Sequence, residues 1–505
     1  MKNIVLIILF QISSFSLFSQ QAGEIDTSFG NNGILEYTFI EEDILYETYI
    51  YDLEKLPNNK LLVIGNANPT CAGQSDNGLI MRLHPDGQMD MTFNNKGYML
   101  FPGQYLRQLI PITETNFFLL STGGVYKIDE DGIIDSTYGN NGFASLGIFH
   151  GSIAMGNNDT SLYLGCIDYS TGSSGFTRVL SKLNPSGFLD TNFGTNGFVT
   201  LPDEDISNID MVDSEDNVYT TGQESMSTSN SKIQVKKFDS NGQPLTEFGD
   251  NGIFSYPVSS NGRATELHLN SDGSIFGAGY GSLGSFQDDG LILFRLLPNG
   301  TLDNTFNNNG IVTIDINGDA IPNGIHLLED DSYIISGTGY NNMYIVKVNQ
   351  NGYLETSFGN QGKVIIPSFN VSGFGTTSSI SDGKIILAGN SYWVATDCLQ
   401  DYYKGVLTQY FVSEALSNKE FDKSKLTYRT FPNPVKDNLT VSFSSPVQEV
   451  SYKLYDIRGQ EVKSKTKFTL VNNKFLMETS NLNSGVYILS VNVNSITINK
   501  KIIKH

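Results

Sequence analysis

Short apolar segments separated by polar turns follow one another along the chain from about residue 22 to residue 411. In the first interval of this region the apolar segments are 34–39, 60–65 and 79–83, and in the last they are 364–366, 384–389 and 405–411. Short runs of this kind, bounded by Gly, Asn, Asp and Ser, are typical of β-strands. With a further short strand before the turns that precede Lys60 and Lys384, the pattern predicts about four strands per unit.

One turn motif, centred on an aromatic residue, recurs seven times between these segments. Glycine stands six residues before the aromatic and four residues after it in every copy, and Gly or Asn follows the aromatic directly. Neighbouring copies are about 55 residues apart. A regular period of this kind is the signature of a repeat architecture. The seven aromatic residues are Phe29, Phe93, Tyr138, Phe193, Phe248, Phe306 and Phe358.

The fixed positions of this motif have physical reasons. Asp, Asn or Ser precedes the first glycine in six copies, and such pairs favour the positive φ of tight turns. We expect the aromatic side chain to be buried between neighbouring units, a burial worth roughly 1.5 to 3 kcal/mol. We also expect a carboxylate three residues before it to accept hydrogen bonds from backbone amides of the following turn. These carboxylates are Asp26, Asp90, Asp135, Asp190, Asp303 and Glu355, and Leu245 stands at this position in the remaining copy.

Four-stranded units repeated four to eight times build a β-propeller, so the sequence predicts an all-β, seven-bladed β-propeller over residues 21–411. The motif at 23–33 has no strand before it, and the strand at 405–411 has no motif after it. We expect these ends to pair in one blade, which closes the ring and removes two exposed sheet edges. A linear solenoid is the alternative. Only 45 residues separate Phe93 from Tyr138, so the second blade is a candidate for an incomplete one.

The two ends of the chain differ from the repeat region. Residues 1–20 combine Lys2, an apolar run at 4–10 and several serines, which is typical of a cleaved secretory signal peptide. A membrane anchor is disfavoured because the run is far shorter than the ~20 residues that span a bilayer. Residues 412–430 are interpreted as a linker. Residues 431–505 hold 10 Lys and Arg against 5 Asp and Glu, and their alternating segments predict a small antiparallel β-sandwich.

Charge and composition exclude several classes of function. The whole chain has a formal net charge of −21, which opposes binding to nucleic acid or to an anionic membrane. Because 39% of the residues are hydrophobic, disorder is disfavoured as well.

The sequence contains no recognisable catalytic motif. There is no GxSxG elbow, phosphate loop or HExxH pair, and no zinc-finger spacing. His268 and His326 occupy similar places in corresponding segments, which favours a structural role. We expect no cofactor, and calcium is the one metal left open, because the acidic clusters at 129–132, 203–205 and 288–290 offer the oxygen ligands that it prefers.

Three cysteines in an exported chain cannot all pair within one molecule. Cys71 and Cys398 occupy comparable loops of the first and seventh units, which a closed ring makes neighbours. We therefore hypothesise a disulfide between Cys71 and Cys398. Cys166 is expected to be a buried free thiol.

Candidate binding residues lie in the variable loops that join equivalent strands. These loops are expected on one side of the ring. The last contains the only tryptophan, Trp393, beside Tyr392, and an equivalent loop begins at Tyr280. Aromatic rings among Asn and Ser can stack on sugar rings or grip a peptide, so the predicted partner is an extracellular glycan or protein. The alternative is that these rings pack against a neighbouring blade.

The repeat resembles a known family. The segments NGTLDNTF at 299–306 and SDGKIILAG at 381–389 carry the resemblance most clearly. They are similar to the delta-60 repeat proteins, and the similarity extends over about residues 22–411. It implies a propeller and no particular reaction.

The C-terminal region resembles a second family. It begins with Phe431-Pro432-Asn433-Pro434, continues with YKLYDIRGQ at 452–460 and ends with LNSGVYILSV at 482–491. These blocks resemble the C-terminal sorting domain of the type IX secretion system of Bacteroidetes. The resemblance implies that the secretion machinery is a partner and that the domain is removed after export. An ordinary adhesion sandwich is the alternative for this module.

Together these features favour a secreted or cell-surface propeller that acts as a binding or adhesion module. An enzyme acting on extracellular polysaccharide and a purely structural surface protein are the alternatives. Carboxylates converging on the centre from several blades would favour the enzyme. A shallow aromatic face without them would favour binding.

Overall fold

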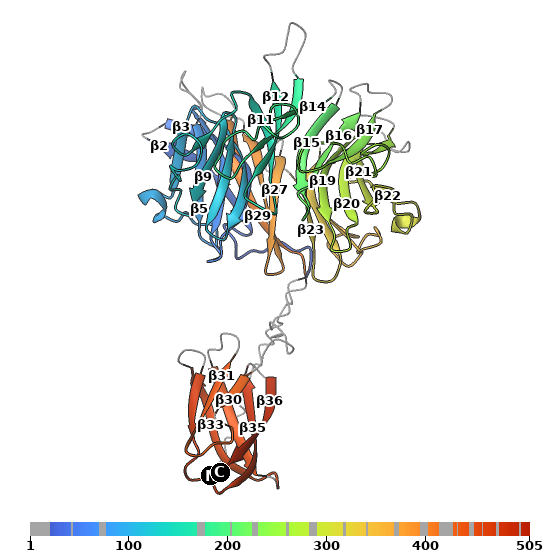
Figure 1. The fold of residues 1–505 in the computed structure, drawn as a ribbon. Coiled ribbons are helices and arrows are strands. Elements are labelled where there is room, and N and C mark those ends of the chain that lie inside the picture. The colour runs from blue at the N-terminus through green and yellow to red at the C-terminus, as the bar shows by residue number, and fades with distance from the viewer. Residues whose placement is uncertain are drawn as a thin grey trace, which may run out of the picture. The chain divides into compact units, whose positions relative to one another are not determined.

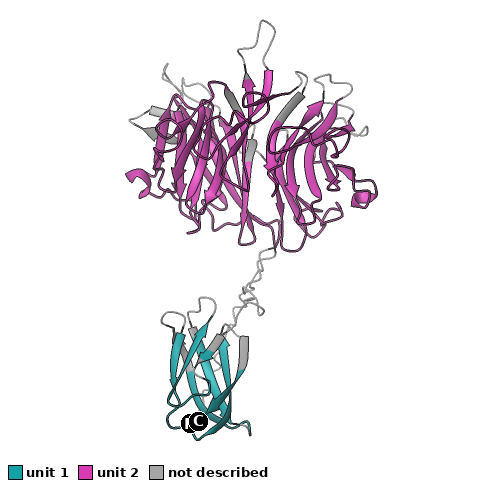
Figure 2. Cartoon of the chain, in the orientation of Figure 1, with its two compact units in different colours: residues 1–20, 415–505 teal, residues 21–414 magenta. Residues whose placement is uncertain are grey.

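The computed structural model divides the chain into two compact units (Figure 2). One unit is Gln21–Glu414 and the other contains Ala415–His505. The structure describes residues 21–41, 44–69, 77–168, 177–201, 205–224, 231–258, 262–281, 290–316, 320–339, 342–367, 373–393, 402–413, 428–431, 433–443, 449–456, 458–470, 474–493 and 496–505.

The described residues of the first unit form seven antiparallel sheets (Figure 1). The first strands of the sheets are β3 (Ile44–Lys55), β7 (Leu106–Thr113), β11 (Phe149–Met155), β15 (Asp205–Val212), β19 (Arg263–Leu269), β23 (Ile321–Leu327) and β27 (Gly373–Ser381). The second strands are β4 (Leu61–Pro69), β8 (Asn116–Ser121), β12 (Leu162–Asp168), β16 (Val218–Glu224), β20 (Ile275–Gly281), β24 (Tyr333–Gly339) and β28 (Lys384–Trp393).

The third and fourth strands complete each sheet. The third strands are β5 (Asn77–Leu83), β9 (Gly124–Asp129), β13 (Thr177–Leu183), β17 (Lys232–Phe238), β21 (Gly290–Leu296), β25 (Asn342–Val348) and β29 (Tyr402–Phe411). The fourth strands are β6 (Tyr98–Pro102), β10 (Phe143–Ala144), β14 (Phe198–Thr200), β18 (Ile253–Pro257), β22 (Ile311–Ile314), β26 (Lys363–Pro367) and, for the last sheet, β1 (Ile34–Tyr37). A short strand β2 (Phe39–Glu41) pairs with β3, and two single-turn 3-10 helices, η1 (Phe93–Asn95) and η2 (Phe306–Asn308), lie at motif aromatics.

The sheets form a closed ring. Each first strand contacts the first strand of the next sheet along the chain, and β27 contacts β3. The ends of the unit meet in the last sheet, where Ile34–Tyr37 runs antiparallel to the end of β29 with Leu35 opposite Leu407. The Gly23 N–H also donates to the Phe411 carbonyl at 2.7 Å. The fold is therefore that of a β-propeller, the predicted meeting of the two ends is confirmed, and the solenoid alternative is wrong.

The turn motifs link the sheets around one rim of this ring. In six of the seven copies the N–H that follows the motif aromatic donates to the carbonyl of the residue before the first glycine of the next copy, as in Gly249 to Asn299 at 2.7 Å. The same bond joins the last copy to the first, from Gly359 to Ala22 at 3.2 Å. The last motif is thus joined directly to the first.

The motif aromatics are the main anchors between sheets. All seven are at most 2% exposed, so the prediction of burial is confirmed. Phe306, for example, belongs to a core cluster shared by β20, β21, β24 and β25. The first glycine of the next copy lies against each ring in six of the copies, and a Cβ on Gly300 would come within 2.8 Å of the Phe248 ring.

The motif carboxylates stabilise the turns locally, as predicted. Five of them accept the backbone N–H two residues further on at 2.9 to 3.1 Å: Asp26, Asp90, Asp135, Asp190 and Asp303. Several also pair with a basic side chain of the same sheet, such as Asp90 with Arg82 and Asp303 with Arg295, both at 2.7 Å. No such turn hydrogen bond is found for Glu355 in the described part of the chain.

The sheet after Phe93 is complete in strand number, so the idea of an incomplete second blade is wrong. It contains β7, β8, β9 and β10. The interval is short because only Thr122 and Gly123 join β8 to β9 and because β10 has two residues.

The C-terminal unit is a small β-sandwich. One sheet contains β30 (Tyr428–Phe431), β31 (Asn438–Phe443) and β34 (Lys474–Glu478). The other contains β33 (Glu461–Thr469), β32 (Glu449–Asp456), β35 (Gly485–Val493) and β36 (Ile496–Lys504). Side chains of both sheets, among them Val441, Leu454 and Leu489, share one core. Because β30 ends at Phe431, this unit begins within the segment that the sequence assigned to the linker.

Candidate functional site

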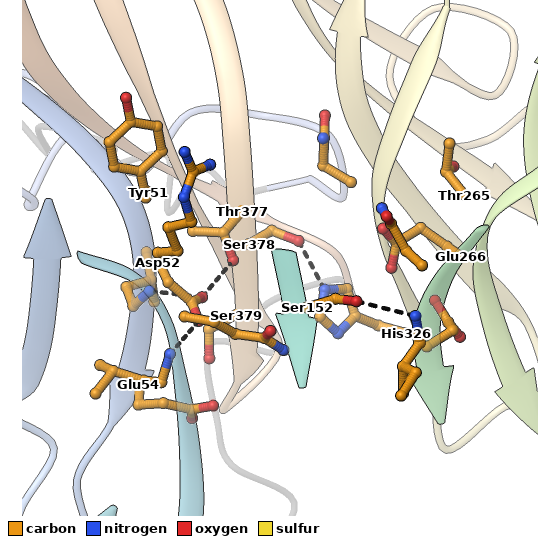
Figure 3. A pocket seen from close by; sticks show the side chains of 18 of the residues that line it. Tyr51, Asp52, Glu54, Ser152, Thr265, Glu266, His326, Thr377, Ser378 and Ser379 are labelled. Atoms are coloured by element: carbon orange, nitrogen blue, oxygen red, sulfur yellow. Dashed lines mark hydrogen bonds between the residues drawn. The ribbon is translucent and has the colours of Figure 1, made fainter. Parts of the chain in front are cut away.

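A cavity of about 570 Å³ lies inside the ring of first strands (Figure 3). Every sheet contributes to its lining through its first strand, so the cavity is the central channel of the propeller. Most of the lining side chains are polar. The lining residues are Tyr51–Glu54, Arg107–Leu109, Gly151, Ser152, Asn208–Asp210, Thr265, Glu266, Asn323, His326 and Thr377–Ile380.

An irregularity in strand pairing explains why polar residues gather at this depth. The register of each first strand with its neighbour shifts where the strand lines the cavity. In β3 the shift lies between Ile50 and Asp52, and in β19 between Ala264 and Glu266. A bulge leaves one residue out of the ladder and re-aims the neighbouring side chains. The freed backbone groups then need other partners.

Side chains of neighbouring first strands supply these partners. A side-chain oxygen on one strand accepts the backbone N–H of the next: Asp52 from Leu109 at 2.8 Å, Gln108 from Ile153 at 3.2 Å, Ser152 from Ile209 at 2.9 Å and Asp210 from Leu267 at 2.9 Å. Asp52 also accepts the Thr377 hydroxyl at 2.9 Å and so connects β27, β3 and β7. These polar residues therefore have a structural role in the ring before any ligand is considered.

Four carboxyl groups line the channel, from β3, β15 and β19. Figure 3 shows Asp52 and Glu54 on one side of the cavity and Glu266 on the other. Burial raises the pKa of Asp52 to about 6 and, with the charge of Asp52 nearby, the pKa of Glu54 to about 8. Burial also raises the pKa of Asp210 to about 8, and burial together with the charges of Asp210 and Asp52 raises the pKa of Glu266 well above its ordinary value. At neutral pH Glu54, Asp210 and Glu266 therefore present protonated carboxyl groups, which can both donate and accept hydrogen bonds, whereas Asp52 is mainly ionised.

A serine and histidine pair lies in the same lining. His326 Nε2 is 2.7 Å from Ser378 Oγ, which is 2.6 Å from Ser336 Oγ. Burial, and secondarily the nearby His268, lowers the pKa of His326 to about 4, so the imidazole is neutral at physiological pH. A Cβ on Gly324 would come within 2.7 Å of Ser378 Oγ, so glycine leaves room for this group of side chains.

The raised pKa of Asp210 predicts an unusual pH dependence of stability. The folded chain keeps a proton on Asp210 that the unfolded chain loses above about pH 4, so the free energy of unfolding should fall as the pH rises from about 4 to about 8. One such proton contributes up to about 1.4 kcal/mol per pH unit. Asp210→Asn removes this proton and keeps an oxygen that can accept the Leu267 N–H.

Urea unfolding at several pH values measures the effect. The Asp210→Asn variant should match the wild-type protein near pH 4 and become progressively more stable than it toward pH 8. A stability difference that does not change over this pH range would contradict a raised pKa at Asp210.

A row of four tyrosines leads from the channel to the last sheet. Tyr51 lines the cavity and stacks on Tyr49 with 6.3 Å between ring centroids. Tyr49 lies 5.0 Å from Tyr403, which lies 5.2 Å from Tyr392. All four side chains are partly exposed. We call Tyr51, Tyr49, Tyr403 and Tyr392 the tyrosine row.

The structure brings only part of the predicted binding set together. Tyr392 joins the tyrosine row, whereas Tyr280 lies on β20, two sheets away, and hydrogen-bonds with Arg263. Trp393 ends β28, but its side chain lies outside the described residues. Sequence analysis did not identify the channel residues other than His326, which it interpreted as structural, and it did not identify Tyr49. Asp52 and Glu266 stand in strands that contain several other polar residues, so the sequence gives no distinct signal for them.

The cysteine and metal expectations have different outcomes. Cys166 is a free thiol that is 3% exposed, and burial raises its pKa to about 12. Cys71 and Cys398 lie outside the described residues, so their disulfide stays a prediction. Within the described ranges no group of three or more His, Cys, Asp or Glu side chains could hold a metal ion. In the acidic cluster at 129–132, Asp131 pairs with Arg82 at 2.5 Å. Residues 203–204 and 288–289 of the other two clusters are not described.

Family models match parts of both units. Residues 429–505 match a secretion system C-terminal sorting domain. Residues 56–93 and 270–306 match a beta-propeller called a domain of unknown function (DUF5122), and each of these spans ends at a motif aromatic. The protein is a β-propeller with a type IX sorting domain. The sorting domain marks the propeller for secretion or for the cell surface.

Solved structures similar to the propeller protein have low sequence identity to it. Drosophila Semaphorin 2a has 9% identity and a TM-score of 0.43, with 96% of this chain and 99% of that chain covered. Prolyl oligopeptidase B from Galerina marginata has 10% identity and a TM-score of 0.42, with 78% and 55% covered. Regucalcin from Agrobacterium tumefaciens, a calcium-binding protein, has 11% identity and a TM-score of 0.32, with 58% and 82% covered.

A search of curated proteins finds no match to the propeller protein. In the described part of the chain, no helix has the length and apolar character needed to cross a membrane. The predicted signal peptide at 1–20 lies outside the described residues.

Proposed function

We propose that the propeller is cargo delivered by the sorting domain and that it acts outside the cell as a binding module for a glycan. The ligand occupies the central channel and the tyrosine row. Cleavage of the signal peptide near residue 20 and later removal of the sorting domain are part of this proposal. A soluble or surface-held propeller would then present the channel to its ligand.

The observation that carries the proposal is the continuity of two chemically different surfaces at Tyr51. This residue lines the polar cavity and also begins the tyrosine row. Sugar rings present apolar C–H faces that pack on aromatic rings and hydroxyl groups that need hydrogen-bond partners. Protonated carboxyl groups such as those of Glu54 and Asp210 can donate a hydrogen bond to a sugar hydroxyl group and can also accept one from it. A neutral, hydroxyl-rich ligand fits this combination better than a polyanion.

A binding assay with a matched control tests the proposal. The full chain is screened on a glycan array, and the affinity of the strongest ligand is measured by calorimetry. Tyr403→Ala removes one of the two middle rings of the tyrosine row and should weaken binding about tenfold or more. Tyr353→Ala is the control, because Tyr353 is 47% exposed on a motif turn outside the row and the variant should bind like the wild-type protein. Trp393→Ala tests the remaining predicted residue beside the row.

Two outcomes would contradict the proposed binding function. One is the absence of any glycan ligand, which would favour a purely structural surface protein. The other is equal affinity of the wild-type protein and Tyr403→Ala, which would place the ligand elsewhere.

An enzyme acting on extracellular polysaccharide is the second candidate. The convergence of carboxyl groups from β3, β15 and β19, with the Ser378–His326 pair beside them, favours it. The same polysaccharides can be assayed for new reducing ends and for released acyl groups. Glu266→Gln or Ser378→Ala should then abolish product formation while binding persists. If the wild-type protein forms no product from a polysaccharide that it binds, the binding function stands alone.

A further inference from the structure

The sorting domain exposes an apolar face on its four-stranded sheet. One face of this sheet contributes Tyr452, Leu454, Leu489, Val491 and Ile502 to the core. The alternate residues point to the opposite side of the sheet, away from this core. Among them Val486 is 36% exposed and Ile488 is 38% exposed, and Tyr455 and Ile503 are partly exposed.

Strand register makes these residues one continuous patch. Tyr455 on β32 stands opposite Ile488 on β35, and Ile488 stands opposite Lys501 on β36. Val486 stands opposite Ile503 in the next row on the same face. Directly paired residues lie about 5 Å apart across strands, so the side chains adjoin. We call Tyr455, Val486, Ile488, Lys501 and Ile503 the outer face.

The solvent-facing side of a small antiparallel sheet is normally polar. Exposed apolar side chains that adjoin one another in a secreted domain mark an interaction surface. The other sheet of the sandwich exposes one large apolar residue, Leu476 at 65%, among those described, and it stands opposite Thr440. The two sheets therefore differ, and only one of them presents several apolar side chains together.

Charge indicates the chemistry of the partner. Residues 431–505 carry 10 Lys and Arg against 5 Asp and Glu, whereas the whole chain carries 32 against 53. An acidic partner is therefore attracted to the sorting domain and repelled by the rest of the chain. Such complementarity steers association and sets orientation. Lys501, exposed in the row with Ile488, places a positive charge beside the apolar residues.

We propose that the outer face is the surface by which the sorting domain docks on a protein of the secretion machinery, and that the partner presents an apolar patch bordered by carboxylates. This inference does not depend on what the propeller binds. It assigns recognition to a folded sheet surface and to side chains from three strands.

Export of the full-length chain by a bacterium with a type IX system tests this proposal. The exported fraction, at the cell surface and in the medium, is measured against the cell-retained fraction by immunoblotting. Ile488→Glu places a charge at the centre of the patch and should lower the exported fraction about tenfold or more. Lys501→Glu reverses the neighbouring charge and should also lower export. Lys501→Arg keeps the positive charge and should be exported like the wild-type protein. Leu476→Glu is the matched control on the other sheet and should be exported like the wild-type protein.

Further measurements separate docking from folding. Protease resistance of the cell-retained Ile488→Glu chain should equal that of the wild-type chain. If Ile488→Glu does not fold, the Lys501 variants decide, because that side chain is exposed. Normal export of both Ile488→Glu and Lys501→Glu would overturn the proposal, as would an equal loss with Leu476→Glu. Concentration-dependent dimers with unchanged export would assign the face to a second copy of the chain, which also overturns it.

Discussion

Replacement of Phe306 by alanine should lower the free energy of unfolding of the propeller by about 3 to 5 kcal/mol. The Phe306 side chain is fully buried and packs edge-on against Phe276, with 5.7 Å between ring centroids. The Arg295 guanidinium lies 5.3 Å from the ring centroid. A Cβ on Gly352 of the next copy would come within 2.5 Å of the ring, so the pocket is closed on that side by backbone. Alanine would leave a cavity that these elements cannot fill.

Urea denaturation followed by circular dichroism measures this loss. Met91→Ala is the control, because Met91 is 60% exposed on an equivalent turn and the change should stay within about 0.5 kcal/mol. Phe306→Leu should fall between the two variants. A loss below about 1 kcal/mol for Phe306→Ala would mean that the motif aromatic is not an anchor between sheets.

Replacement of Gly23 by alanine should destabilise the closure of the ring by about 2 to 4 kcal/mol. Gly23 has a φ of +92°, and a Cβ there would lie 2.4 Å from the Gly359 nitrogen of the last motif. Alanine would therefore combine an unfavourable backbone conformation with a steric clash. Both motifs would have to move apart, which would weaken the Gly359 to Ala22 hydrogen bond.

A second glycine separates these two costs. Gly103 has a φ of +70°, but a Cβ there would have no atom within 4 Å. Gly103→Ala should therefore lose only about 1 kcal/mol, the backbone cost alone. The difference between the two variants, measured from urea unfolding midpoints, reports the contact across the closure. Equal losses would contradict a tight junction between the first and last motifs.

The frame of the fold could be predicted because its determinants are local. The glycines around Phe306 and the carboxylate at Asp303 act within one turn. All seven copies repeat the glycines and six repeat the carboxylate, so the weak local patterns reinforce one another. The closure could be inferred because the repeat region begins with a motif that has no strand before it and ends with a strand that has no motif after it. Residues 23 and 411 are therefore expected to meet in the last sheet.

The channel could not be predicted because it depends on residues that are distant in sequence. Asp52, Asp210 and Glu266 come together only after the ring has closed, and the first strands that carry them differ in sequence from one another. Tyr49 and Tyr403 meet for the same reason. His326 was interpreted as structural, and its hydrogen bond to Ser378 is compatible with that role as well as with chemistry in the channel. Tyr392, which was predicted as a binding residue because aromatic residues cluster there in the sequence, lies at one end of the tyrosine row.

A disulfide across the closing strands tests the closed ring most directly. Glu36 and Val406 stand opposite each other on β1 and β29. Glu36→Cys and Val406→Cys are introduced together in a chain whose Cys71 and Cys398 are replaced by serine, and the bond is measured by peptide mapping after mild oxidation. The closed propeller predicts a nearly complete bond between residues 36 and 406 in the folded protein. Free thiols at residues 36 and 406 in a folded chain would contradict the closure.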